Sequence, residues 1–122
     1  MPAVIVDTSI WRKYLAGVVS TRALGQLLDD DAVLLHPFVL GELTVGGLSH
    51  REIAIFERLP EAPIVDHAEV LAFVAGRHLT RKGIGWVDAH LLAATLLAAA
   101  QLWSADRALI AAARSLGVAF TD

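Results

Sequence analysis

Residues 4–11 read VIVDTSIW, and this stretch joins a short apolar run to a carboxylate and two hydroxyls. The apolar run over residues 3–6 predicts a buried β-strand, and Asp7 follows at its carboxyl end. Asp, Thr and Ser are favourable N-cap residues, so Asp7 can begin the helix expected over residues 10–16. The carboxyl end of a parallel strand is also where α/β proteins place ligand sites. This segment alone leaves both roles open.

Short apolar runs alternate with segments of helical periodicity along the whole chain. We expect further strands at residues 33–35, 63–65, 102–104 and 118–120. Helices of the intervening length return the chain in parallel. We therefore predict a single α/β domain over residues 1–122, with a five-stranded parallel sheet in a three-layer α/β/α arrangement. The expected helices cover residues 10–16, 21–28, 37 onward, 49–59, 66–81, 86–100 and 107–116.

The composition excludes several classes of protein. The chain has no cysteine, so it forms neither disulfides nor thiolate metal sites, and a cytoplasmic location is the simplest fit. The stretch between Asp88 and Asp106 is too short and too polar for a membrane-spanning helix. Asp7 interrupts the first apolar run before it reaches the length of a signal peptide. With 56% hydrophobic residues, the chain has apolar surface to spare for a partner or a second copy.

Four of the 13 acidic residues have no simple structural explanation. Asp7 and Asp106 both follow predicted parallel strands and should lie at the same edge of the sheet. Asp88 is the only acid in an otherwise apolar helix, and Glu42 is isolated among apolar neighbours. No basic residue lies within one helical turn of Glu42 or Asp88, and an unpaired buried carboxylate needs a proton or a cation.

Carboxylates that converge without matching bases form a hard, oxygen-rich site that suits Mg²⁺ or Mn²⁺. The five histidines lack the spacing of zinc ligands. His90 lies two residues after Asp88, and we interpret it as a polar residue satisfied by its neighbours. The sequence thus predicts a divalent-cation site at the carboxyl edge of the sheet.

The motifs VIVDTS, LGEL, GWVDAHLLAA and LWSADRAL resemble, in order and spacing, those of the PIN-domain family, and most closely its VapC-type toxins. The resemblance covers essentially the full chain. It implies a PIN fold with a five-stranded parallel sheet, and Mg²⁺- or Mn²⁺-dependent endoribonuclease activity. It also implies a cytoplasmic toxin that a VapB-type antitoxin neutralises and that reaches operator DNA only through this antitoxin. Matched residue by residue, Asp7, Glu42, Asp88 and Asp106 correspond to the catalytic and metal-binding acids, with Ser9 and Ser104 as supporting hydroxyls.

Basic residues adjoin these acids in the sequence, and we expect some of them to contact RNA phosphates. These candidates are Arg12, Lys13, Arg81, Lys82 and Arg107.

Apolar residues crowd the first predicted helix, where two stripes run side by side. One stripe can cover the sheet while the other faces a neighbouring helix or a partner. We expect a homodimer that also binds an antitoxin helix in a groove. The candidate interface residues are Trp11, Tyr14 and Leu15, with the ordinary core as the alternative role.

Two other functions remain as alternatives. One is a module whose nuclease site is vestigial, which binds an antitoxin and acts as a co-repressor. The other is a Mg²⁺-dependent phosphatase or phospho-receiver domain. Phosphatases of the haloacid-dehalogenase type need a second Asp where this chain has Ser9, and receivers need a Lys after the last strand, where this chain ends VAFTD.

Overall fold

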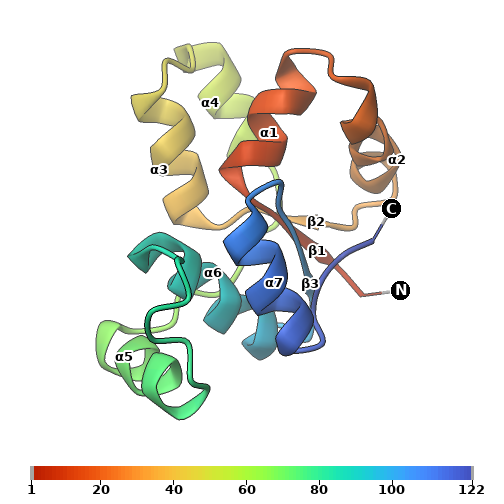
Figure 1. Ribbon diagram of the computed structural model, residues 1–122. Coiled ribbons are helices and arrows are strands. Elements are labelled where there is room, and N and C mark those ends of the chain that lie inside the picture. The colour runs from red at the N-terminus through yellow and green to blue at the C-terminus, as the bar shows by residue number, and fades with distance from the viewer. Residues whose placement is uncertain (1, 122) are drawn as a thin grey trace.

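A parallel sheet forms the centre of the computed structural model, which describes residues 2–121 (Figure 1). Strand β1 (Val4–Val6) lies in the middle, between β2 (Val33–Leu34) and β3 (Gln101–Trp103). Both neighbours run parallel to β1, which places Ile5 opposite Leu34 on one side and Leu102 on the other. The carboxyl ends of β1 and β3 therefore meet at one edge, and the predicted α/β class with a parallel sheet is confirmed.

The two outer strands of the expected five-stranded sheet are each reduced to a single bridge. Leu35 pairs with Glu61, and Leu102 pairs with Ala119, both in parallel. The predicted strand at residues 63–65 is wrong, since the pairing occurs earlier: the Leu35 N–H donates to the Pro60 carbonyl at 2.8 Å, and the Ala62 N–H to the Leu35 carbonyl at 2.9 Å. Pro63 has no N–H to extend this ladder.

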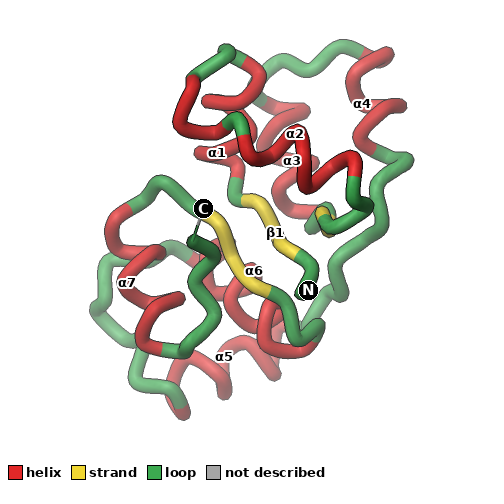
Figure 2. The backbone as a smooth tube through the Cα atoms, turned by 90° about the vertical axis from the view of Figure 1, so that its right-hand side faces the viewer, coloured by secondary structure: helices red, strands yellow, loops and turns green. Residues whose placement is uncertain are grey.

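Helices cover both sides of the sheet (Figures 1 and 2). The first half of the chain supplies the helices on one side, and the second half those on the other. The first group comprises α1 (Thr8–Leu15), the 3₁₀ turn η1 (Val19–Thr21), α2 (Ala23–Asp29), α3 (Pro37–Val45) and α4 (His50–Phe56). The second group comprises α5 (His67–Gly76), α6 (Trp86–Leu97) and α7 (Arg107–Ser115).

Helix α5 ends earlier than the predicted helix over residues 66–81. His78 adopts a left-handed backbone with φ of 56°, and the Leu79 N–H donates to the Val74 carbonyl at 3.0 Å. This 6→1 hydrogen bond closes the helix in a Schellman motif. The prediction failed because a left-handed residue at this position is most often Gly, and His gives no such signal. Residues 77–85 consequently form a loop between α5 and α6.

The core is built around β1 and the middle of α6. Val4 and Ile5 are fully buried, as are Leu91 and Leu92 of α6. This burial explains why α6 is apolar around most of its circumference. Of the helices within residues 2–121, none has the length and apolar character required to cross a membrane.

Trp11 belongs to this core, and its predicted role as an interface residue is wrong. Its side chain is only 2% exposed, and its ring packs edge-on against Phe56, with the centroids 4.8 Å apart. A buried side chain has no exposed surface to lose when a partner binds. Tyr14 is half-buried, and Leu15 is 49% exposed, so these two keep their predicted place as interface candidates.

Candidate active site

Asp7 lies directly after β1 and is almost fully buried. Its Oδ1 accepts a hydrogen bond from the Thr8 N–H at 2.8 Å, so Asp7 does cap α1. Its Oδ2 accepts hydrogen bonds from the hydroxyls of Ser9 and Ser104, each at 2.8 Å. A simple N-cap needs only the first of these bonds. The two extra donors fix the orientation of the carboxylate at the carboxyl edge of the sheet.

The two serine hydroxyls also tie the ends of β1 and β3 together. Ser104 Oγ accepts from the Asp106 N–H at 3.0 Å, and Ser9 Oγ accepts from the Ala105 N–H at 3.0 Å. Each hydroxyl therefore receives a backbone N–H on one side and donates to Asp7 on the other. This arrangement fixes the orientation of both hydroxyls, and it gives Ser9 and Ser104 the supporting position expected from the sequence.

Thr8 performs a task that the sequence analysis did not assign to it. Its hydroxyl donates to Glu42 Oε1 at 2.6 Å, which connects the start of α1 to the middle of α3. Thr8 is buried, and Glu42 is half-buried. The segment Asp7–Ser9 thus positions two acids at once, through Asp7 itself and through the Thr8 contact with Glu42. Its only signal in the sequence was its place between Asp7 and Ser9.

The negative charges of the other three acids all act on Asp88. Burial raises the pKa of Asp88, the Gly85 N–H opposes this by donating to Oδ2 at 2.9 Å, and the negative charges of Asp7, Asp106 and Glu42 raise the pKa further. Repulsion of this kind requires the four carboxylates to share one region. The structure therefore brings Asp7, Glu42, Asp88 and Asp106 together electrostatically.

Asp106 is the most accessible of the four. It is exposed, and its Oδ1 accepts a hydrogen bond from the Leu109 N–H at 3.0 Å, which makes it the N-cap of α7. Its second carboxylate oxygen is free to face the other acids.

The oxygens of the four carboxylates suit a hard divalent cation, although they do not lie close enough together to form a complete coordination shell. Within residues 2–121, no three His, Asp or Glu side chains lie close enough to hold a metal ion jointly. The carboxylate oxygens of Asp88 and of the three acids whose charges act on it are nevertheless the kind of ligand that Mg²⁺ or Mn²⁺ prefers. A cation would remove the repulsion that raises the pKa of Asp88.

The predicted RNA-binding bases are all exposed, but they do not converge on one spot. Arg12 and Glu42 line the same groove of about 550 Å³, so Arg12 lies beside the acids. Arg107 directly follows Asp106 in the sequence. Arg81 lines a second hollow together with Trp86. Lys82 lines a third, between the α5–α6 loop and α7, and Lys13 lines none of these three cavities.

A row of aromatic and imidazole rings joins α3 to α6 and was not foreseen. His90 packs edge-on between Phe38 and Trp86, with ring centroids 4.7 and 4.8 Å away, and His36 packs against Phe38 at 5.0 Å. The prediction that His90 is satisfied by polar neighbours is wrong, because its buried Nδ1 has no hydrogen-bond partner among the described residues.

Both buried imidazoles in this row are uncharged at neutral pH. Burial, and secondarily the nearby His90, lower the pKa of His36 to about 4. Burial, followed by the charge of His67, also lowers the pKa of His90. These two rings therefore pack as aromatic groups and add no positive charge for binding phosphates.

Comparisons with known proteins agree with this geometry. Ribonuclease VapC32 of Mycobacterium tuberculosis, from strains CDC 1551 / Oshkosh and ATCC 25618 / H37Rv, is 38% identical over 122 residues, covering 98% of this chain and 97% of the relative. The crystal structure of PAE2754 from Pyrobaculum aerophilum has a similar fold, with a TM-score of 0.58 and 14% identity over 91% of this chain and 79% of that one. The family model of the PIN domain matches residues 4–115. The chain therefore belongs to the PIN-domain family and is of the VapC type.

Proposed function

We propose that this protein is the toxin of a type II toxin–antitoxin pair and acts as a Mg²⁺- or Mn²⁺-dependent endoribonuclease. The observation that carries the proposal is the group of four acids in which Asp7, Glu42 and Asp106 act on Asp88, with Asp7 and Glu42 oriented by buried hydroxyls. The similarity to Ribonuclease VapC32 over almost the whole chain supports RNA as the substrate. The bases Arg12 and Arg107 beside the acids are suited to contact its phosphates.

The side chains of the site have distinct tasks in this mechanism. A bound divalent cation would polarise the phosphoryl oxygen and lower the pKa of water for in-line attack. Asp7 has one rigid orientation, because three hydrogen bonds fix its two oxygens. Thr8 orients Glu42 by donating to Oε1, which leaves Oε2 as a ligand or as an acceptor for a water proton. Asp88 and Asp106 each have one oxygen tied to a backbone N–H and one available to the cation.

An antitoxin of the VapB type is the proposed regulator, and the apolar groove beside Glu42 is its proposed binding surface. Phe38 and Val45 line this groove together with Arg12, and Val45 is 90% exposed. An amphipathic helix or an extended segment would cover Val45 and the exposed Leu15 while blocking the acids. Self-association as a homodimer, and a cytoplasmic location, complete the proposal.

The test is cleavage of single-stranded RNA by the purified chain. We expect endonucleolytic cuts with Mg²⁺ or Mn²⁺, no cuts with EDTA, and recovery when excess Mg²⁺ is added back. A chain that binds an antitoxin but cuts no RNA with either metal would favour the vestigial module. Cleavage that persists in EDTA would contradict the metal-dependent mechanism.

A further inference from the structure

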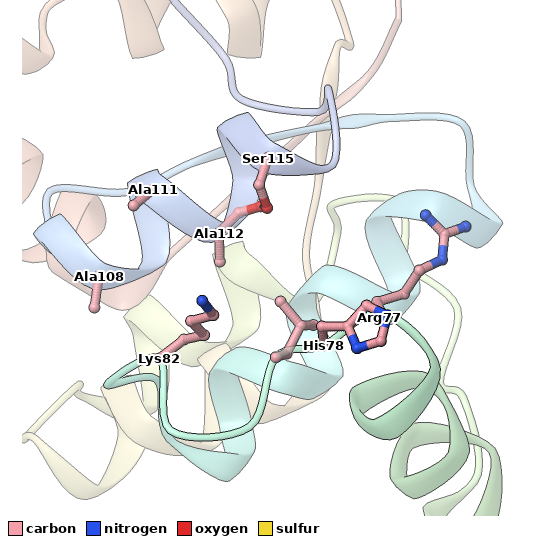
Figure 3. A pocket seen from close by; sticks show the side chains of 8 residues that line it. Arg77, His78, Lys82, Ala108, Ala111, Ala112 and Ser115 are labelled. Atoms are coloured by element: carbon pink, nitrogen blue, oxygen red, sulfur yellow. The ribbon is translucent and has the colours of Figure 1, made fainter.

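A hollow of about 360 Å³ lies between the α5–α6 loop and helix α7, apart from the groove beside Glu42 (Figure 3). The loop side contributes Arg77, His78, Leu79 and Lys82, and α7 contributes Ala108, Ala111, Ala112 and Ser115.

The charges around this hollow are all of one sign. Its lining includes Arg77, His78 and Lys82, and none of the eight lining residues is acidic. Figure 3 shows the Lys82 amino group extending toward α7, and the His78 ring beside Arg77 at the opposite end of the hollow. The three alanines of α7 keep the space open because their side chains are short. The Ser115 hydroxyl already donates to the Ala112 carbonyl at 2.7 Å, so the loop supplies the donors.

Two of the four acids lie close in the sequence to residues that line the hollow. Its loop side leads through Gly83 to Gly85, whose N–H binds Asp88. Its helix side begins at Ala108, two residues after Asp106, the N-cap of α7. The loop and α7 are also packed closely here, since a Cβ placed on Gly83 would lie 3.4 Å from the Ala108 Cβ. The hollow and these two acids are therefore joined by short stretches of chain, three residues from Lys82 to Gly85 and two from Asp106 to Ala108.

We propose that this hollow binds a backbone phosphate of single-stranded RNA, outside the bond that is cut. The inference rests on the proposed function, because it places the continuation of the same substrate strand. Proteins that bind single strands track the backbone with a positively charged groove, and Arg77 and Lys82 provide such a segment, with the His78 imidazole as a further polar group. The contact adds affinity without reading sequence, since it is made to a phosphate.

His78 offers a substitution that separates binding from folding. Its backbone is left-handed, with φ of 56°, and Gly adopts this conformation without steric cost. His78→Gly should therefore leave the melting temperature unchanged or raise it, while removing an imidazole from the hollow. Ala99→Gly is the matched control, because Ala99 has φ of 51° and does not line the hollow.

The experiment measures binding of a fluorescent single-stranded RNA by anisotropy, in EDTA and at several salt concentrations. The background is the 122-residue chain carrying Asp88→Asn, so that the probe stays intact. We expect Lys82→Gln and His78→Gly each to weaken RNA binding about three- to fivefold. Lys82→Gln should also reduce the slope of log K against log salt by about 0.7, the value for one lost phosphate contact on a single strand. Ala99→Gly, and Arg22→Gln as a charge control on the far side of the sheet, should change neither.

Inorganic phosphate and polyglutamate serve as competing probes on the same variants. RNA binding that is equal in all variants overturns the inference and leaves the proposed function intact. If the Lys82 and His78 variants bind polyglutamate more weakly but RNA equally well, the hollow binds an acidic protein partner and the inference is overturned. If they bind only inorganic phosphate more weakly, the hollow binds a small anion and the inference is again overturned. If the unsubstituted chain neither binds nor cuts RNA, the proposed function itself fails.

Discussion

Asp88→Asn is expected to abolish metal-dependent RNA cleavage and, at the same time, to raise the melting temperature of the metal-free protein. The amide cannot supply a charged ligand, so activity should fall by about a hundred- to a thousandfold, the cost typical of lost electrostatic stabilisation in a transition state. Stability should rise because the substitution removes a half-buried charge that Asp7, Asp106 and Glu42 repel. Asn can keep the acceptor for the Gly85 N–H, which stands at 2.9 Å.

The pH dependence of this gain follows from the raised pKa of Asp88. A carboxyl whose folded pKa lies above its unfolded value of 3.8 binds its proton more tightly in the folded state. Stability is therefore lost as pH rises through the interval between the two pKa values. The advantage of Asp88→Asn in EDTA should be full at pH 7 and small at pH 3. Thermal unfolding followed by circular dichroism at both pH values checks this.

Asp7→Asn is the matched comparison, and it should lose activity and stability together. The Asp7 Oδ2 accepts from both Ser9 and Ser104, whose hydroxyls are already committed to backbone N–H groups on their other side. An amide nitrogen at this place would face two donors, at a cost of about 1–3 kcal/mol. Equal melting temperatures for the two variants would contradict the assigned hydrogen bonds, and cleavage at the wild-type rate by either would contradict the assigned site.

Trp11→Ala is expected to destabilise the fold by about 3–5 kcal/mol, the usual cost of emptying a large aromatic site in a core. The ring is 2% exposed and packs against Phe56 and Tyr14. Trp11→Phe should cost much less, because the buried indole N–H has no hydrogen-bond partner among the described residues, so no bond is lost. Chemical denaturation of both variants gives the two free energies of unfolding.

Leu15→Ala tests the proposed interface without disturbing the core, although Leu15 and Trp11 lie on the same helix. Leu15 is 49% exposed, so its removal should change the free energy of unfolding by less than about 1 kcal/mol. It should instead weaken the antitoxin complex or the homodimer, measured by calorimetry and light scattering. If the Trp11→Ala variant is as stable as the wild type, Trp11 is not part of the core, and the described packing is contradicted.

Periodicity predicted the central part of the fold, because buried strands and amphipathic helices leave strong patterns. Strand β1, helix α6 and the α/β class followed from such patterns. The pairing of Ala119 with Leu102 also falls in the strand expected at residues 118–120, but that of Leu35 with Glu61 was missed, since a single bridge needs only a few hydrogen bonds and no apolar run. The end of α5 was also missed, because His78 occupies a left-handed position at which Gly would have been recognised.

The candidate site was predicted through its carboxylates and only in part through their supports. An acidic residue with no basic residue nearby can be recognised from the sequence alone, and this identified Glu42 and Asp88. The contact of Thr8 with Glu42 joins residues 34 positions apart, and only the packing of α1 on α3 produces it. The row from His36 to Trp86 was missed for the same reason, since imidazole rings that pack as aromatics have no spacing rule.

The central claim is that the four acids together form one binding site for a divalent cation. Mn²⁺ binding followed by electron paramagnetic resonance tests this claim most directly. Free Mn²⁺ is titrated into the metal-free chain and into the Asp88→Asn variant, with Mg²⁺ as the competitor. The account predicts saturable binding by the wild type, displacement by Mg²⁺, and a loss of affinity of at least tenfold in Asp88→Asn. Binding of equal strength in both chains, or no saturable binding by the wild type, would contradict it.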